Sequence, residues 1–224
     1  MTDSPLALQL AARVEKIDPP LVDDIYAAAA LAVIELLEDE RSQPMTPLGE
    51  PGEWYDEVAA WNGARIRKIM RRGRASAWRR AQDVPGVTVT VGTAEVRAFV
   101  PGPLDEAPRD LAKLQIQSSP LDEPALTSER PSIGVGELVI AVTPDLEMSW
   151  GKLGAQCAHA GQRAWERSQP EARDRWRTMG SSVRLLHPDA ALWDELRAGP
   201  VEAIRDGGFT EIPAGSLTAI GWIE

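Results

Sequence analysis

The chain has 224 residues, which is long enough for one large domain or two small ones with an adequate hydrophobic core. Its 34 acidic residues outnumber 24 basic ones, and the resulting net charge of −10 repels nucleic acids and anionic membranes on average. With one cysteine and two histidines, the sequence excludes an intramolecular disulfide and argues against a structural zinc site.

Neither the start of the chain nor its most apolar stretch has the pattern of a targeting or membrane segment. The opening MTDSPLALQLAARVEK lacks the basic start and long apolar run of a signal peptide. The apolar stretch AAAALAVIELL, 27–37, is far shorter than the roughly 20 residues of a membrane span. We therefore expect a soluble, cytoplasmic protein.

The first half is predicted to form an α+β domain over residues 1–116. A helix over 21–37 follows Pro19-Pro20, and a second helix over 54–80 has an interruption near Asn62-Gly63. The run VTVTVGTAEVRAFV, 87–100, predicts a β-hairpin around Gly92-Thr93, and a short helix follows over 105–114. Residues 117–136 hold three prolines and two glycines, which indicates an interdomain linker.

The second half, 137–224, alternates predicted strands and helices, which favours an α/β domain with a partly parallel sheet. The predicted strands are 137–142, 183–187, 201–205 and 217–223, and the predicted helices are 149–167, 170–179 and 189–197. A degenerate internal repeat is suggested by 94–111 and 181–196, which share the order strand, proline, acidic short helix. The alternative, that a helix followed by a strand is simply common, stays open.

The segment WGKLGAQCAHAGQRAW, 150–165, has two distinct faces if it is helical. At about 100° per residue, one polar face collects four side chains, Lys152, Gln156, His159 and Arg163. Cys157 falls on a separate apolar face, so Cys157 and His159 cannot form a catalytic dyad within one helix. The expected state of Cys157 is a buried, unreactive thiol. An ordinary solvated face remains the alternative for the four polar residues.

Two stretches match signatures of one known family. DLEMSWGKLGAQCAHA, 145–160, resembles the signature helix of the type 2, archaeal and eukaryotic, peptidyl-tRNA hydrolases. RDGGFTEIPAGSLTAIG, 205–221, is similar to the second signature of that family. The resemblance covers residues 137–224 and extends to actinobacterial-like proteins that carry an N-terminal extension.

The resemblance implies a three-layer α/β/α fold on a four-stranded mixed sheet, and hydrolysis of the ester that joins a peptide to the 3′ ribose of tRNA. It implies no metal and no cofactor, a tRNA partner and often a dimer; if the repeat is real, the N-terminal half takes the place of a second subunit. The implied catalytic residues are Lys152, His159 and Asp206. The implied substrate-binding residues are Gln156, Asp145, Thr210, Ser216 and Arg163.

These residue types suit ester hydrolysis. Asp206, followed by two glycines at the end of a predicted strand, is the candidate to orient or deprotonate the attacking water. Lys152 supplies a positive charge near the developing oxyanion. His159 lies about two helical turns further on, where it would shuttle a proton or contact the terminal adenosine. An ordinary turn around Asp206 is the alternative.

The sequence also departs from the family. Trp150 stands where the family usually has lysine, and Phe209 replaces an expected arginine or similar polar residue. The stretch between the strands 183–187 and 201–205 is shorter than expected, which indicates a truncated helix. These departures favour a second reading, a tRNA- or RNA-binding protein that keeps the fold without turnover. A third reading is a hydrolase of another aminoacyl ester.

A basic segment, ARIRKIMRRGRASAWRR at 64–80, stands out in this acidic chain because it carries eight basic residues and no acidic one. We expect a helix with one basic face that grips the tRNA backbone, with Trp78 available to stack on a base. A solvated face paired with carboxylates is the alternative. The predicted tRNA-binding residues are Arg65, Arg67, Lys68, Arg71, Arg72, Arg74 and Arg79.

Overall fold

The computed structural model describes residues 4–63, 67–116, 133–208 and 211–224. The first sheet has the strand order β2-β1-β4-β3, and β5 pairs with β1 beside it. Strand β1 is parallel to β2 and antiparallel to β4, and β3 and β4 form an antiparallel hairpin. Its strands are β1 (Leu6–Arg13), β2 (Lys68–Gly73), β3 (Gly86–Val91), β4 (Ala94–Phe99) and β5 (Gly102–Pro103).

The second sheet has four strands in the order β7-β6-β9-β8. Strand β6 is parallel to β7 and antiparallel to β9, and β8 is antiparallel to β9. Its strands are β6 (Leu138–Val142), β7 (Val183–Leu186), β8 (Glu202–Arg205) and β9 (Leu217–Ile223). The predicted four-stranded mixed sheet in the C-terminal half is confirmed.

The helices occupy corresponding places in the two halves of the chain. In the first half they are α1 (Val22–Glu38), α2 (Tyr55–Asn62), α3 (Ala75–Ala81) and α4 (Arg109–Ala112), with short 3-10 turns η1 (Glu40–Ser42) and η2 (Leu104–Glu106). In the second half they are α5 (Trp150–Arg167), α6 (Pro170–Thr178) and α7 (Ala190–Arg197). None of the helices in the described ranges is long and apolar enough to cross a membrane.

The two halves share one topology. Leaving out η1, the order β1-α1-α2-β2-α3-β3-β4 in the first matches β6-α5-α6-β7-α7-β8-β9 in the second. The pairings match as well, because each opening strand lies between a parallel partner and an antiparallel partner from the final hairpin. We call residues 4–116 the N-terminal unit and residues 133–224 the C-terminal unit, each without its undescribed positions.

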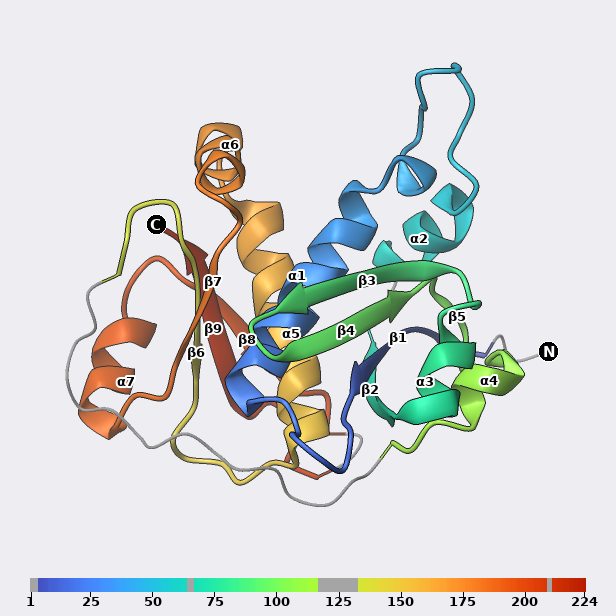
Figure 1. Ribbon diagram of the computed structural model, residues 1–224. Coiled ribbons are helices and arrows are strands. Elements are labelled where there is room, and N and C mark those ends of the chain that lie inside the picture. Colours follow the sequence, from blue (N-terminus) through green and yellow to red (C-terminus); the bar gives the residue numbers. More distant parts are fainter. Residues whose placement is uncertain (1–3, 64–66, 117–132, 209–210) are drawn as a thin grey trace.

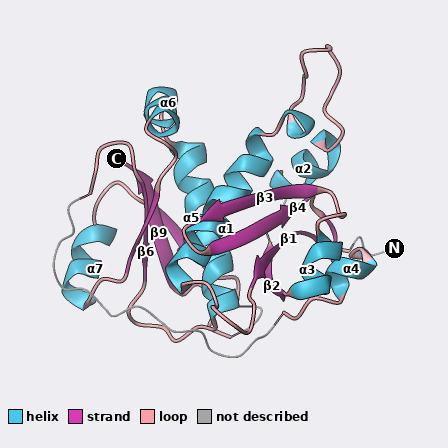
Figure 2. Ribbon diagram, viewed as in Figure 1, coloured by secondary structure: helices cyan, strands magenta, loops and turns pink. Residues whose placement is uncertain are grey.

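Five layers follow from this arrangement. Figure 1 shows α1 and α5 side by side between the two sheets, with α7 on the outer face of one sheet and α3 and α4 on the outer face of the other. Figure 2 makes the same separation visible as two groups of strands with helices between and outside them. Both units therefore have helices on both faces of a mixed sheet, as predicted for the C-terminal half.

One continuous hydrophobic core joins the units through α1 and α5. It includes Leu10 and Val96 from one sheet and Ile140 and Ala219 from the other. Small residues let the two helices approach closely, because a Cβ atom added to Gly161 would lie 2.7 Å from the Cβ of Ala30. The packing of α1 against α5 thus joins the two sheets into one structure.

The residues at their N-terminal ends explain where these two helices begin. Helix α1 begins just after Pro19-Pro20 and has Asp23 and Asp24 in its first turn, where negative charge is favourable near the helix N-terminus. Helix α5 is capped by Ser149, whose Oγ accepts a hydrogen bond from the Lys152 backbone N–H at 3.2 Å. Both predicted helices, and the hairpin around Gly92-Thr93, are confirmed.

The prediction of a basic helix over 64–80 is wrong for most of that segment. Residues 68–73 form the edge strand β2, parallel to β1, and only 75–81 form a helix. Strand β2 pairs with a strand about sixty residues earlier in the chain. The helix prediction considered only the local sequence and therefore did not include this pairing. Arg65 and most of the predicted 117–136 linker lie outside the described residues.

Strand β1 and the true correspondence between the two halves were also absent from the sequence prediction. The predicted repeat compared 94–111 with 181–196, which are β4 and β7 with the segments that follow them. By its place in the strand order, β4 is instead the counterpart of β9, and β2 is the counterpart of β7. The similarity of the two halves is therefore present, but in a different alignment from the one that the sequence suggested.

Candidate active site

A large cleft lies between α5, the end of β8 and the edge strand β2 of the N-terminal unit. Its volume is about 1350 Å³, which exceeds the range of roughly 300–1,000 Å³ typical of small-molecule pockets. Four polar side chains of α5 line it, namely Lys152, Gln156, His159 and Arg163. The polar face predicted from helical spacing is therefore a wall of the cleft rather than an ordinary solvated face.

Asp206 is the centre of the polar network in the cleft. Its side chain is 7% exposed, and its Oδ2 accepts hydrogen bonds from Lys152 Nζ and, at 2.9 Å, from Gln156 Nε2. The other carboxylate oxygen accepts the Gly208 backbone N–H at 2.8 Å. The structure therefore brings together Lys152 and Asp206, two of the three predicted catalytic residues, from elements far apart in the sequence.

Thr218 fixes the orientation of Gln156. This threonine of β9 is fully buried, and its hydroxyl donates to Gln156 Oε1 at 2.8 Å and lies 3.1 Å from the Ile204 carbonyl oxygen. With its oxygen engaged, Gln156 turns its amide N–H toward Asp206. Thr218 was not among the predicted site residues, although it stands within the second signature stretch; its position in a strand covered on both faces was the available signal.

The loop after β8 is tied to the start of α5 by a second contact. Glu211 accepts hydrogen bonds from the Ser149 backbone N–H at 2.8 Å and from the Ser149 hydroxyl at 2.7 Å. Because Ser149 caps the helix that carries Lys152, Glu211 helps to fix Lys152 opposite Asp206. Neither Glu211 nor Ser149 was singled out from the sequence.

His159 is held as a neutral imidazole. Burial, together with the nearby positive charges of Lys68 and Arg163, lowers its pKa from 6.5 to about 2. A histidine with this pKa does not carry a proton as imidazolium near neutral pH. It keeps a ring face and one hydrogen-bond donor and acceptor for a ligand.

The N-terminal unit supplies the opposite wall of the cleft. Arg67, Lys68, Ile69 and Met70 line it from β2 and the residue before it, and Asn62 lines it from the end of α2. Lys68 Nζ donates to Gln162 Oε1 of α5 at 2.5 Å. The pKa of Lys68 is lowered from 10.5 to about 7, mainly by burial; the charge of Glu166 opposes this shift and that of Arg163 adds to it. The site is therefore shared between the two units.

Other predicted residues lie elsewhere. Asp145 is exposed and does not line the cleft in the described ranges, and Thr210 and Phe209 fall outside the described residues. The Ser216 carbonyl accepts the Asp206 backbone N–H at 2.9 Å, so Ser216 supports the loop through its backbone. Cys157 is fully buried, as predicted, and burial raises the pKa of its thiol.

The basic segment divides between the cleft, the core and the surface. Arg71 is buried, with Nε donating to Gln9 Oε1 at 2.6 Å and NH1 donating to the Leu114 carbonyl at 3.0 Å, so it cannot reach a tRNA. Trp78 is also buried, against Ala11 and Phe99, and cannot stack on a base as expected. Arg74 and Arg79 are exposed at the ends of α3, away from the residues that line the cleft.

A second, smaller pocket is the topological counterpart of the cleft. Its volume is about 300 Å³, and it is lined by α1, the end of β3 and strand β7 of the other unit. Asp23, Asp24 and Ala27 line it at the helical positions that Gly151, Lys152 and Ala155 occupy in the cleft, counted from the first residue of each helix.

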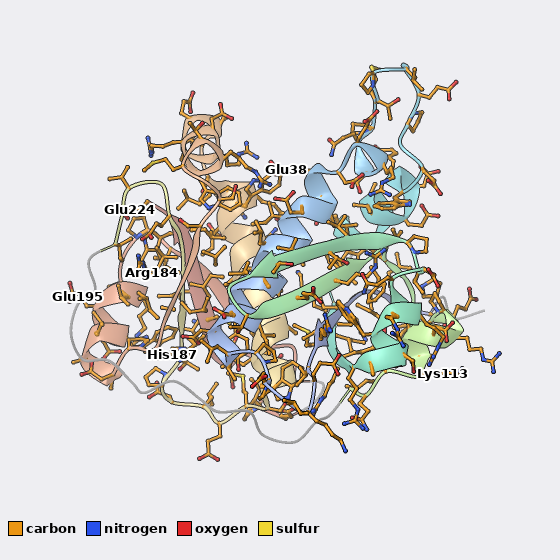
Figure 3. The ribbon with its side chains drawn as sticks, viewed as in Figure 1. Glu38, Lys113, Arg184, His187, Glu195 and Glu224 are labelled. Atoms are coloured by element: carbon orange, nitrogen blue, oxygen red, sulfur yellow. The ribbon has the colours of Figure 1, made fainter. Side chains whose placement is uncertain are left out.

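Polar contacts close this second pocket. Asp24 accepts the backbone N–H and the hydroxyl of Thr93, both at 2.7 Å, and Asp23 lies 2.7 Å from His187 Nε2. Arg184 donates to both oxygens of Glu137, at 2.7 and 2.8 Å. Arg184 and His187 are labelled in Figure 3, on and just after β7. The small pocket has an aspartate where the cleft has a lysine.

The comparisons with known proteins concern the C-terminal unit. A family model described as "Peptidyl-tRNA hydrolase PTH2" matches residues 137–223. A "Peptidyl-tRNA hydrolase" of the archaeon Methanothermobacter thermautotrophicus is 32% identical over 90 residues, which are 37% of this chain and 80% of that protein. The chain belongs to the peptidyl-tRNA hydrolase PTH2 family.

Other members of the family show the same extent of similarity. A "Peptidyl-tRNA hydrolase" of Staphylothermus marinus is 36% identical over 96 residues, covering 37% of this chain and 77% of that protein. The "Peptidyl-tRNA hydrolase 2, mitochondrial" of Bos taurus is 34% identical over 98 residues, covering 39% of this chain and 55% of that protein. These matches leave the N-terminal unit to be understood from the structure.

The departure at Trp150 is a change of packing as well as of charge. Trp150 is the first residue of α5 and is 5% exposed, and it belongs to the core that joins the two units. An apolar ring at this position adds to the contact between units, whereas a lysine would be expected to reach solvent.

Proposed function

We propose that this protein hydrolyses the ester bond between a peptide and the 3′ ribose of tRNA. The observation that supports this most is the convergence of Lys152, Gln156 and Asp206 in a large cleft of a chain that belongs to the peptidyl-tRNA hydrolase family. The network has a carboxylate to act on water, a cation to act on developing negative charge, and an amide that holds the carboxylate in place.

In the proposed reaction Asp206 orients the attacking water and accepts its proton. The water oxygen forms a bond to the ester carbonyl carbon, and the carbonyl oxygen becomes a tetrahedral oxyanion. The bond from that carbon to the ribose oxygen then breaks, and the proton passes to this oxygen. The products are a peptide with a free carboxyl group and a tRNA with a free 3′ hydroxyl.

Lys152 stabilises the oxyanion in this scheme. It lies in the first turn of α5, where the helix N-terminus adds a positive potential to that of the ammonium group. Its side chain is only 13% exposed, so its charge acts across a partly desolvated site. Removing one such electrostatic contact typically lowers the rate by about 10²–10³-fold.

His159 serves substrate binding in this proposal rather than proton transfer. Because its pKa is lowered to about 2, its imidazolium form is not available near neutral pH. Its position two turns beyond Lys152 suits contact with the terminal adenosine, through stacking or a hydrogen bond.

The tRNA approaches along a surface that is basic although the whole chain is acidic. Among the described residues that line the cleft, five are cationic and two are carboxylates. The cations are Arg67, Lys68, Lys152, Arg163 and Arg205, and the carboxylates are Asp206 and Glu211. We further propose that Arg72, Arg74 and Arg79 add weaker contacts outside the cleft.

We also infer that the N-terminal unit takes the place of a second subunit. Support comes from its identical strand order and from the core that it shares with the C-terminal unit through α1 and α5. The proposal predicts the mass of a single chain in solution by light scattering. A stable dimer at micromolar concentration would contradict it.

One assay tests the activity. The purified protein is given N-acetylated aminoacyl-tRNA, and release of the N-acetylated amino acid is measured beside Lys152→Met. We expect turnover by the wild type and a loss of about 10²–10³-fold in kcat for the variant. Lys113→Met, just after the outer helix α4 and labelled in Figure 3, is the matched control. No wild-type turnover would refute the proposed activity, and unchanged turnover by Lys152→Met would refute the site.

A further inference from the structure

Lys68 of the N-terminal unit extends across the cleft toward α5 of the other unit. Its ammonium lies 5.0 Å from the centre of the Trp61 ring and 2.5 Å from the amide oxygen of Gln162. The aromatic face and the amide dipole stabilise the positive charge without neutralising it. Lys68 is thus a partly buried cation whose two described direct contacts are with uncharged groups, while the Glu166 carboxylate is near enough to raise its pKa.

Arg163 lies on the same side of α5, one turn beyond His159. Its NH1 is 3.0 Å from Glu166 Oε2, and Gln162 Nε2 donates to the other oxygen of Glu166 at 2.7 Å. The four side chains Lys68, Gln162, Arg163 and Glu166 therefore form one cluster with two cations and one carboxylate. Its net charge is positive.

The two cations are close enough to repel each other. Burial is the largest cause of the lowered pKa of Lys68; the Glu166 carboxylate raises this pKa, and the charge of Arg163 lowers it. Both cations also lower the pKa of His159, which places the imidazole beside them. Holding two like charges together in a partly buried site is unfavourable, and an anion bound between them would relieve the repulsion.

In the small pocket, the corresponding strand carries a cation that is neutralised within the protein. There Arg184, on the strand that corresponds to β2, is paired with both oxygens of Glu137. At the equivalent wall of the large cleft, Lys68 meets an amide instead. Lys68 thus has no direct carboxylate partner among its described contacts, which is what binding of an external anion requires.

We propose that Lys68 and Arg163 together hold a phosphate of the single-stranded acceptor end of tRNA, so that the N-terminal unit supplies half of the substrate-binding site. This inference rests on the proposed function, and it names the part of the substrate that the N-terminal unit recognises. Arginine binds phosphate oxygens with two parallel hydrogen bonds, and lysine adds a point charge.

The spacing along α5 fits this assignment. Lys152 and Arg163 are eleven residues apart, which is about 16 Å along the helix axis. A phosphate between Lys68 and Arg163 therefore lies beyond the scissile ester, along the nucleotide chain. His159 stands between the two positions, where a base of that chain would pass.

Binding of deacylated tRNA tests the proposal independently of turnover. We compare tRNA that ends in CCA with tRNA that lacks these three nucleotides, for the wild type, Lys68→Met and Arg163→Gln. Each substitution should weaken binding of the complete tRNA by about 10-fold and reduce the slope of log K against log salt by about 0.7. Neither should change binding of the shortened tRNA.

Matched controls separate this effect from general charge. Lys113→Met removes an exposed cation at the C-terminal cap of α4, and Arg197→Gln removes one from the end of α7. Neither residue lines the cleft among the described residues, so both variants should leave the acceptor-end preference unchanged. If Lys68→Met is unstable by circular dichroism, Arg163→Gln still decides the outcome. Equal losses with both tRNAs, or an unchanged salt slope for Arg163→Gln, would overturn the proposal.

The pH dependence of tRNA binding distinguishes a phosphate contact from a purely structural role of Lys68, because a structural role would not make binding depend on the protonation of Lys68. With the pKa of Lys68 near 7, binding of a phosphate favours the protonated form, so affinity should fall as pH rises through this value. The other charged or titratable groups around Lys68 are His159, Arg163 and Glu166 on α5 and Arg67 beside it. Lys68→Arg should keep the affinity and lose this pH dependence, whereas a retained pH dependence would contradict the assignment.

The steady-state constants distinguish this proposal from the proposed activity. On N-acetylated aminoacyl-tRNA, Lys68→Met should raise KM with kcat nearly unchanged, because a uniform binding contact is removed. A protein without turnover that still shows the acceptor-end effect would refute the activity alone. Turnover with KM unchanged in both Lys68→Met and Arg163→Gln would refute the phosphate contact alone.

Discussion

The N-terminal and C-terminal units have the same order of elements and the same strand pairings, yet the pocket along α5 has a volume of about 1350 Å³ and its counterpart along α1 about 300 Å³. Counted from the first residue of the central helix, Lys152, Gln156 and His159 of one unit correspond to Asp24, Ala28 and Leu31 of the other. The end of β8 carries Asp206, whereas β3 passes through Gly92 directly into a tight hairpin. A common fold therefore does not determine a common site, which depends on a few side chains.

The sharpest way to test the comparison is to remove the corresponding aspartates. Asp206→Asn should lower kcat/KM for peptidyl-tRNA by about 10²–10³-fold, because the proposed base is lost. Asp24→Asn in the small pocket should leave kcat/KM unchanged and affect only stability, through the contacts to Thr93. Equal losses of activity in the two variants would show that both pockets contribute to the reaction.

The second prediction concerns His159, whose counterpart is Leu31. Its folded-state pKa of about 2 lies below its ordinary 6.5, so the unfolded chain binds this proton more readily between those values. The wild type should therefore lose stability relative to His159→Leu as pH falls below 6.5, by up to about 1.4 kcal/mol per pH unit.

Urea unfolding of both proteins at several pH values from neutral to mildly acidic measures this difference. The contribution of the carboxylates to the free energy of unfolding is the same in both proteins, so it cancels in the difference between wild type and variant. A constant difference in the free energy of unfolding over this range would contradict the neutral, buried state of His159.

The third prediction tests how closely the units are joined. Gly161→Val should lower the free energy of unfolding by about 1–3 kcal/mol, because the new side chain would overlap Ala30 of α1. Gly102→Ala is a suitable control, since nothing lies within 4 Å of a Cβ added there. A single thermal transition that moves as a whole in Gly161→Val would show that the units unfold together, and an unshifted transition would contradict the close crossing of α1 and α5.

The smallest expected effect is at Thr218, which acts through Gln156. Thr218→Val keeps the shape of the side chain but leaves Gln156 Oε1 without its donor, at a cost of about 1–3 kcal/mol to the arrangement. We expect a loss of about 10-fold in kcat/KM and its recovery in Thr218→Ser. Thr178→Val in α6 is the matched control. Unchanged activity in Thr218→Val would show that the orientation of Gln156 does not contribute to the reaction.

The sequence is sufficient for those parts of the fold whose signals are local. The apolar period and flanking prolines predict α1, and the Gly92-Thr93 turn between β-rich runs predicts the β3-β4 hairpin. In contrast, four of the six residues of β2 are lysine, methionine or arginine, which favour helices in isolation. It becomes a strand because β1 offers a parallel partner, and that pairing is not visible in any local window.

The same distinction holds for the site. Helical spacing alone places Lys152, Gln156, His159 and Arg163 on one face, and the family signature adds Asp206. Thr218 was not predicted, because its role depends on a contact made across the sheet. Lys68 was predicted to bind tRNA, but from a helix face, and its position on β2 opposite α5 depends on contacts across the two units. Arg71 was assigned to tRNA from its charge, but its strand position turns it into the interior.

Carrying both units in one chain has a consequence for how the two walls of the cleft can diverge. In an assembly of identical subunits, any substitution on one wall also appears at the symmetry-related position of the other site. Here β2 and α5 are encoded separately, so Lys68 can be selected for its effect on one wall without placing a lysine in β7. Joining the units therefore frees one of them to specialise in the proposed phosphate contact, while the other keeps the proposed catalytic residues.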